Sequence, residues 1–317
     1  MALGDQDAVT VVIPTHNRLA LLLETLRSVA EQGPRAQSLV VAAGSTDGTQ
    51  DALAARGVPS ICHPAGGLGS GRARNAGLAQ VTTPFVAFVD SDDLLVPGAL
   101  DRLVAALGTA PQAPFAFGFG LAASHEPAGW TPEGLLAPTP AERRGLAAAI
   151  YARNFVPSSG AVVRTGAARA IQGYDPGLVY SEDQDFWLRL ARPAEPVFAG
   201  GLVSIHRRHT GNRHVSARAK QDDDTIGSRA STDPRMAANE PARRGMQLCE
   251  EALDALRSRR PAVLGSAVER LLVATDHRGA TLSAAGRHFR RRRAARAAGI
   301  ALWDADPALR DWLAGYA

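Results

Sequence analysis

Three carboxylates follow a short apolar run near the end of the first third of the chain. Asp90, Asp92 and Asp93 come directly after residues 85–89 (FVAFV), which follow the breaker Thr83-Pro84 and therefore predict a buried strand. Open α/β sheets bind ligands at the carboxyl ends of their strands, and closely spaced carboxylates there suit a divalent cation that also holds substrate phosphates. The pattern favours a metal and diphosphate site. Capping of the next helix by Asp92 or Asp93 is the structural alternative.

A second group of acids lies far along the chain, at the start of the segment SEDQDFWLRL (residues 181–190). Ser181 could cap a helix here, and the apolar residues at spacings of three and four would bury one of its faces. Glu182, Asp183 and Asp185 would then occupy the first turn, where the helix dipole favours their ionised form. From the residues alone, these acids serve either helix capping or chemistry.

The acids must be positioned by strands and helices, and the apolar residues of the sequence show the spacings of both in alternation. Strands are expected at residues 9–13, 38–42, 60–63, 85–89, 115–119 and 197–206. Helices are expected from Leu19, from about Gln50, after the glycine-rich loop PAGGLGSGRARNAG, and over the leucines of residues 94–107. Residues 125–140, which contain Trp130, are predicted to form a loop that could shape an acceptor pocket. This order predicts strand-turn-helix units and an α/β fold.

Composition limits the remaining possibilities. The 317 residues are 45% hydrophobic, which allows one large core and a smaller second unit. The two cysteines lie far apart without metal-site spacing, no apolar run is long enough to span a membrane, and the first residues do not form a signal peptide. We therefore expect a cytoplasmic protein. The net charge of +4 comes almost entirely from arginine, which is typical of a GC-rich genome, so no nucleic-acid partner is expected.

Five motifs together resemble those of a family 2 glycosyltransferase with the A-type (GT-A) fold. They are VVIPTHNR, GSTDGT, RARNAG, DSDD and SEDQDFWLRL, and they follow the family's order and spacing between residues 9 and 216. The resemblance implies an α/β, Rossmann-like nucleotide-diphospho-sugar transferase fold with a mainly parallel sheet. The implied activity is inverting transfer of a sugar from a nucleoside-diphosphate sugar to a hydroxyl of a saccharide, a lipid-linked molecule or a small natural product.

The resemblance also assigns roles to residues. Asp183 matches the family's general base, and Asp92, Asp90 and His209 are expected to hold Mg²⁺ or Mn²⁺, with His206 as the second choice for the histidine. The remaining expectations are donor contacts at Pro14, Thr15, Asn17, Arg18, Gly44, Arg74, Asp90 and Ser91, and acceptor-side positions at Trp130, Glu182 and Trp187. Without the family, PTHN is an ordinary turn, and Trp130 and Trp187 are ordinary core residues.

The sequence departs from the family pattern at Ala42 and Ala43, where two acids are usual. The missing carboxylate would meet the imide of uracil, so strict UDP specificity is not expected. The same substitution leaves a catalytically weak nucleotide-sugar-binding or scaffolding protein as the alternative function.

The domain organisation expected from these patterns has three parts. Residues 1–215 form the catalytic domain, residues 216–244 a linker or mobile lid, and residues 245–317 a small helical unit. The last part contains Arg287, Arg290–Arg293 and Arg296, which suit either peripheral contact with a membrane or an anionic acceptor, or a solvated helix face. The oligomeric state is not predicted.

Overall fold

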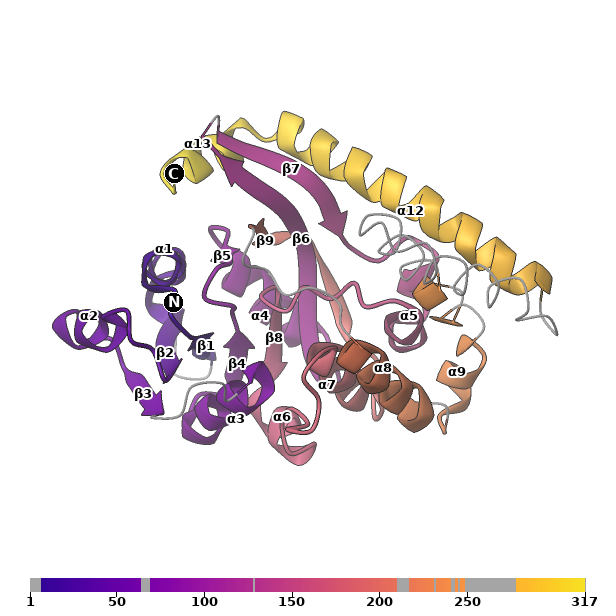
Figure 1. Ribbon diagram of the computed structural model, residues 1–317, viewed down its shortest axis with the longest axis horizontal. Helices are drawn as coiled ribbons and strands as arrows, with labels where there is room; N and C mark the ends of the chain where they lie inside the picture. The colour runs from indigo at the N-terminus through magenta and orange to yellow at the C-terminus, as the bar shows by residue number, and fades with distance from the viewer. Residues whose placement is uncertain are drawn as a thin grey trace.

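The computed structural model describes residues 7–63, 69–127, 129–209, 217–230, 232–240, 243–244, 246–248 and 278–316. Its strands form one nine-stranded sheet in the order β3-β2-β1-β4-β8-β6-β9-β5, with β7 paired to β6 (Figure 1). The strands are β1 (Val9–Thr15), β2 (Ala36–Ala43), β3 (Ser60–His63), β4 (Phe85–Phe88), β5 (Leu94–Leu95), β6 (Phe115–Glu126), β7 (Gly129–Leu136), β8 (Ala161–Arg164) and β9 (Val197–Arg208).

The helices lie between these strands and after them. They are α1 (Leu19–Ala30), α2 (Thr49–Ala55), α3 (Ser70–Gln80), α4 (Ala99–Thr109), α5 (Leu146–Ala152), α6 (Thr165–Ala170), α7 (Glu182–Ala191), α8 (Ala217–Ala230), α9 (Pro234–Ala237), α12 (Arg278–Ala305) and α13 (Pro307–Ala314). Two short 3-10 turns are η2 (Gly33–Arg35) and η3 (Glu142–Arg144).

The amino-terminal half of the sheet is a Rossmann-like unit. Strand β1 runs parallel to both β2 and β4, and β2 runs parallel to β3. The carboxyl ends of β1, β2 and β4 therefore meet at one edge, and each is followed by a predicted site segment. The expected α/β fold is confirmed. Beyond β4 the sheet becomes mixed, because β8 pairs antiparallel with β4 and with β6, whereas β6 and β9 are parallel.

The central strands β1 and β4 are buried on both faces. Successive side chains of a strand point to opposite sides, so alternate residues enter two different cores. Val12, Val86 and Phe88 lie in a core with the apolar residues of α5 and α7, whereas Val11 and Ala87 lie in a second core with those of α1 and α4. Two-sided burial explains why these strands read as short continuous apolar runs in the sequence.

Three expectations from the sequence are wrong. Leu94 and Leu95 belong to β5, which pairs with β9, and α4 begins only at Ala99. The predicted loop at residues 125–140 is in large part strand, because β6 reaches Glu126 and β7 runs from Gly129 to Leu136 in an antiparallel hairpin. Residues 217–230 and 234–237, within the predicted linker, form helices α8 and α9.

The described part of the carboxyl-terminal region is helical, as predicted, and packs closely on the rest of the chain. Helix α12 runs along β7 (Figure 1), and a Cβ atom on Gly299 would lie only 3.1 Å from the backbone of Gly134. Helix α13 joins α1, where Trp312 Nε1 donates to Glu31 at 2.7 Å and the guanidinium of Arg27 lies over the Tyr316 ring.

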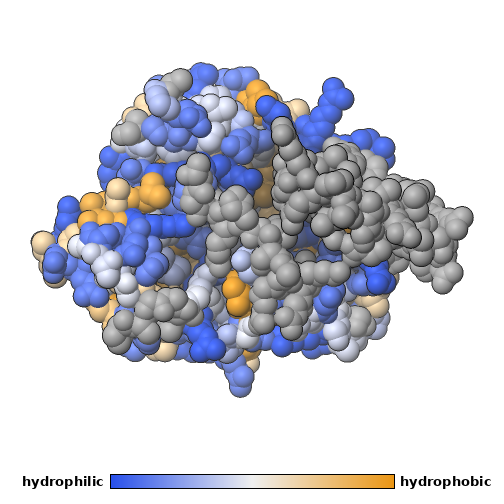
Figure 2. All heavy atoms as spheres, viewed as in Figure 1, coloured by the Kyte–Doolittle hydropathy of each residue, from blue (hydrophilic) through white to orange (hydrophobic). Residues whose placement is uncertain are grey.

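The surface in Figure 2 is mainly hydrophilic, and its coloured hydrophobic residues stand in small separate groups. Within the described residues, no helix combines the length and the apolar character needed to cross a bilayer.

Candidate active site

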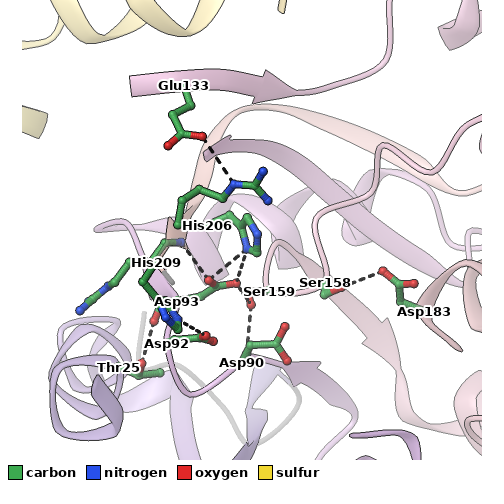
Figure 3. Close-up of polar contacts among 12 residues, drawn as sticks. Thr25, Asp90, Asp92, Asp93, Glu133, Ser158, Ser159, Asp183, His206 and His209 are labelled. Carbon is green, nitrogen blue, oxygen red and sulfur yellow. Dashed lines mark hydrogen bonds and ion pairs between the residues drawn. The ribbon is translucent and has the colours of Figure 1, made fainter. Parts of the chain in front are cut away.

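The DSDD segment forms the loop between β4 and β5, and the side chain of its last residue, Asp93, connects the loop to Ser159 and to β9 (Figure 3). The buried Asp93 carboxylate accepts hydrogen bonds from Ser159 Oγ at 2.6 Å and from the Arg207 backbone N–H at 3.1 Å. His206 Nδ1 lies 3.2 Å from the same carboxylate, whose charge raises the pKa of His206 to about 9. Asp93 and His206 therefore form a structural ion pair that fastens the loop to β9. Neither Asp92 nor Asp93 caps α4, whose N-cap is Gly98.

Asp92 faces a guanidinium and an imidazole from distant parts of the chain. Its Oδ2 atom accepts from the guanidinium of Arg18, which precedes α1, and lies 2.9 Å from Nε2 of His209, just beyond β9. The predicted donor residue Arg18 and the predicted metal ligands Asp92 and His209 are thus brought together. The contacts bring the VVIPTHNR and DSDD motifs and the histidine that follows β9 to one point of the sheet edge.

The donor set at this point suits a cation that takes most of its ligands from a substrate. No cluster of three or more acidic, histidine or cysteine side chains is arranged for metal binding among the described residues. Asp92 and His209 supply one carboxylate oxygen and one imidazole nitrogen at 2.9 Å from each other. Mg²⁺ is commonly held by one or two carboxylates together with substrate phosphates, and Mn²⁺ also accepts imidazole, so this pair fits such an ion.

Arg74 on α3 connects the DSDD loop to the second acid cluster. Its guanidinium donates to Asp90 Oδ1 at 2.6 Å and to Glu182 Oε1 at 3.0 Å, and its side chain is only 3% exposed. These two carboxylates hold the pKa of Arg74 above its usual value despite burial. Arg74 is therefore engaged with protein acids, and contact with a nucleotide stays a prediction. Glu182 faces Arg74 and not solvent.

The neighbours of Arg74 in RARNAG have separate structural tasks. Asn75 donates from Nδ2 to the backbone oxygen of Tyr174 and accepts from its N–H, both at 2.8 Å. Gly77 allows α3 to approach β1, since a Cβ atom there would lie 2.3 Å from Val12. The motif thus anchors α3 to the sheet, to the loop before α7 and to both acid clusters.

Asp183 is held in place by side chains that come from the segment before β8. Its Oδ2 atom accepts from Asn154 Nδ2 at 3.0 Å and from Ser158 Oγ at 2.9 Å (Figure 3), and Oδ1 accepts from the Gln184 N–H at 2.7 Å. Burial and the nearby charge of Glu182 raise the pKa of Asp183 above its ordinary value, against the opposing effect of Arg74. A raised pKa makes the carboxylate a stronger proton acceptor.

The other acid of this turn points elsewhere. Asp185 is buried and pairs with Arg189 Nε at 2.7 Å and with Arg229 at 3.3 Å. The three acids of the motif therefore point in different directions, as helical geometry requires. Glu182 contacts Arg74, Asp183 contacts Asn154 and Ser158, and Asp185 contacts Arg189 and, on α8, Arg229. Ser181 occupies the N-cap position, as predicted, but its side chain makes no capping hydrogen bond.

The remaining predicted donor residues lie at the carboxyl ends of β1, β2 and β4. Pro14 and Thr15 end β1, Asn17 follows them, Gly44 follows β2, and Ser91 follows Asp90. Asn17 Oδ1 accepts from the Thr46 N–H at 2.7 Å, which ties the two loops together. The Thr15 hydroxyl is buried and has no hydrogen-bond partner within the described residues.

Comparison with known proteins identifies the amino-terminal half. Residues 10–151 match the model of glycosyl transferase family 2. Uncharacterized glycosyltransferases of Mycobacterium tuberculosis and Mycobacterium bovis are 42% identical over 101 residues, which are 32% of this chain and 44% of each relative. This part of the chain is therefore similar to family 2 glycosyltransferases. The match spans less than half the length of these curated relatives.

Solved structures extend the likeness to the fold of almost the whole chain. Residues 1–349 of TarS from S. aureus, crystallised with UDP-GlcNAc, align with a TM-score of 0.58 and 18% identity over 90% of this chain and 81% of that one. A longer TarS structure aligns with a TM-score of 0.53 and 20% identity over 74% of this chain and 42% of that one. At this level of identity, the alignments establish the GT-A fold and nothing finer.

Two residues that were predicted on the acceptor side lie elsewhere. Trp187 is fully buried against Phe115 and Phe186, so its predicted contact with an acceptor is wrong. Trp130 donates from Nε1 to the backbone oxygen of Leu313 at 3.0 Å, so the indole packs on α13 and does not line a loop pocket. Both tryptophans take the structural role that is commoner for this residue type.

The sequence patterns did not reveal the residues that orient the acids of the candidate site. Asn154 and Ser158 hold Asp183, and Ser159 links the backbone N–H of Asp90 to the carboxylate of Asp93. Only their position, just before a strand next to β4, could have pointed to the site edge. The glycine-rich loop at residues 64–68 and residues 210–216 of the basic segment lie outside the described residues.

Proposed function

We propose that the protein is an inverting glycosyltransferase that moves a sugar from a nucleoside-diphosphate sugar to an acceptor hydroxyl. One observation carries the proposal. A partly exposed carboxylate, Asp183, is oriented by Asn154 and Ser158 and is connected through Glu182 and Arg74 to Asp90 of the DSDD loop. A base and a diphosphate-binding loop are thereby fixed relative to each other, as an in-line displacement requires.

The reaction is a single displacement at the anomeric carbon. Asp183 Oδ accepts the proton of the acceptor hydroxyl while the hydroxyl oxygen forms the new glycosidic bond and the bond to the diphosphate oxygen breaks. The configuration inverts because attack and departure occur on opposite faces. Asn154 and Ser158 keep the carboxylate oriented through the transfer, and its raised pKa increases its basicity.

The diphosphate side is served by Asp92, His209 and Arg18. Asp92 and His209 would hold Mg²⁺ or Mn²⁺, which when bound would neutralise negative charge on the diphosphate. The guanidinium of Arg18, next to Asp92, suits bidentate contact with phosphate oxygens. Asp93, His206 and Ser159 keep the loop in place beneath them.

The donor nucleotide is expected to bind along the ends of β1 and β2. TarS, which shares the fold, was crystallised with UDP-GlcNAc, and this supports a nucleotide sugar as the class of donor. Ala42 and Ala43 offer no side-chain acceptor to an imide, and Ala43 contributes its backbone oxygen to His16 Nδ1 at 2.6 Å. We therefore propose a base preference that is not strictly for uracil.

The test is replacement of the base with its neutral isostere. Asp183→Asn is expected to lower turnover by roughly 10² to 10⁴ with little change in nucleotide affinity. Turnover is measured as nucleoside-diphosphate release from a panel of UDP-, dTDP- and GDP-sugars with hydroxyl acceptors, and product configuration is measured by NMR. In the active protein, turnover should fall as the pH drops through the pKa of Asp183, which lies above the ordinary aspartate value.

Asp101→Asn is the matched control, because Asp101 on α4 is an exposed carboxylate in an ion pair with Arg35. It should retain full turnover. Near-normal turnover of Asp183→Asn, or a product that retains the donor configuration, would exclude the proposed mechanism. Nucleotide binding without turnover in the native protein with every donor and acceptor would favour the alternative of a binding or scaffolding protein.

A further inference from the structure

Helix α8, predicted from the sequence as a linker, contacts the segment that leads into α7. The carboxylate of Asp222 is buried, and a single oxygen, Oδ2, accepts the backbone N–H groups of Val179 and Tyr180, each at 2.8 Å. These two residues lie three and four positions before Asp183. A side chain from α8 thus accepts hydrogen bonds from two backbone N–H groups that lie just before α7.

A second residue of α8 holds the same segment on both sides of Asp183. Arg229 NH1 lies 2.6 Å from Asp175 Oδ2 and 3.3 Å from Asp185 Oδ1. The hydrogen bond to Asp175 and the charges of both acids raise the pKa of Arg229. Asp175 precedes the loop and Asp185 lies in the first turn of α7, so Arg229 joins the two ends of the segment.

The residue between these contacts has a conformation that needs external support. Ser181 has φ of 53° and ψ of 18°, in the left-handed region that non-glycine residues seldom adopt. Its side chain makes no capping hydrogen bond. Such a conformation persists only where surrounding contacts determine it, and Asp222 binds the residue immediately before it.

We propose that Asp222, assisted by Arg229, is a positioning residue that fixes the start of α7 so that Asp183 faces Asn154 and Ser158. This positioning role of Asp222 rests on the proposed function, in which Asp183 is the base. Asp222 itself touches no reacting group. It acts through the backbone of residues 179 and 180.

The proposal is tested by separating the hydrogen bonds of α8 from its packing. Asp222→Ala removes both bonds, whereas Asp222→Asn keeps one amide oxygen that can accept both N–H groups. Asp224→Ala is the matched control, because Asp224 is exposed on the same helix. Ile226→Ala is the packing control, because Ile226 is buried in the core beneath α8.

Hydrogen exchange of peptides that cover residues 176–186 is the main measurement, together with kcat and nucleotide affinity. Asp222→Ala is expected to speed exchange in these peptides by roughly ten- to a hundredfold, because two hydrogen bonds to a charged acceptor are lost. It should also lower kcat while nucleotide affinity stays constant. Asp222→Asn should restore both properties, and Asp224→Ala should match the native protein.

Three results would overturn the proposal. The first is unchanged hydrogen exchange in Asp222→Ala. The second is an Asp222→Asn variant whose exchange and kcat are as impaired as those of Asp222→Ala. The third is an effect of Ile226→Ala on the same peptides as large as that of Asp222→Ala, which would show that α8 acts by packing alone. The exchange measurement needs no turnover. Active Asp183→Asn together with faster exchange in Asp222→Ala would therefore overturn the proposed function and leave the contact of α8 with the loop established.

Discussion

Replacement of Arg74 with methionine tests the link between the two acid clusters most directly. Methionine keeps much of the side-chain volume but leaves Glu182, whose side chain is 8% exposed, without its cationic partner. Loss of one partner from a buried ion pair costs about 3–5 kcal/mol in free energy of unfolding. Asp90 contributes less to this cost, because its side chain is 31% exposed and can be hydrated. The melting temperature should therefore fall by on the order of 10 °C.

The double variant Arg74→Met/Glu182→Gln provides the internal check. It removes the buried charge that Arg74 no longer compensates, so it should recover more than half of the lost stability in urea unfolding, a coupling that independent sites would not show.

The single variant Arg74→Met should also change the pH dependence of the rate. Burial and Glu182 raise the pKa of Asp183 and Arg74 lowers it, so loss of Arg74 should raise this pKa further. A carboxylate with a higher pKa is protonated at higher pH. The acid limb of the pH–rate profile of Arg74→Met should therefore shift to higher pH.

Two results would refute this reasoning. A melting temperature of Arg74→Met within about 2 °C of the native value would mean that no buried ion pair exists in solution. An acid limb that moved to lower pH would mean that Arg74 does not act on Asp183.

Two further predictions concern packing and the metal. Gly77→Ala should destabilise the protein by about 1–3 kcal/mol in urea unfolding, because its Cβ atom would lie 2.3 Å from Val12, and Gly166→Ala, where a Cβ atom meets nothing within 4 Å, is the matched control. Asp92→Asn should abolish the metal dependence of nucleoside-diphosphate binding in calorimetry while Asp101→Asn keeps it, and unchanged dependence on Mg²⁺ or Mn²⁺ in Asp92→Asn would place the ion elsewhere.

Much of the fold could be predicted because the central strands are buried on both faces. The runs at residues 9–13 and 85–89 are continuous and apolar for that reason, and the predicted strand at residues 60–63 has the bounds of β3. By contrast, β5 consists of two leucines whose partners, Ser204 and Ile205, lie more than a hundred positions away. No local pattern reveals such a pairing, so the leucines were assigned to the following helix.

The site was predictable where a motif fixes both residue type and spacing. Asp92 and His209 were expected to share an ion and Arg18 to contact the donor, and the three side chains do lie together, although their roles stay predictions. The supporting residues were not predictable, because Asn154, Ser158 and Asp222 are ordinary polar residues whose roles depend on tertiary contacts. Arg74 was expected to contact the nucleotide or diphosphate, which stays a prediction, and its burial between Asp90 and Glu182 is a tertiary feature that the motif does not reveal.

The attachment of α13 to α1 has a consequence for the order of folding. The hydrogen bonds from Arg27 to Gly315 and from Trp312 to Glu31 span 288 and 281 positions, and Leu309 and Leu313 complete the core beneath α1. Closure of so long a loop is slow, and synthesis delivers these residues after the central strands. Leu309 and Leu313 therefore pack against α1 only after most of the sheet has formed. Until then, the apolar face of α1 that they cover is exposed in a nascent chain.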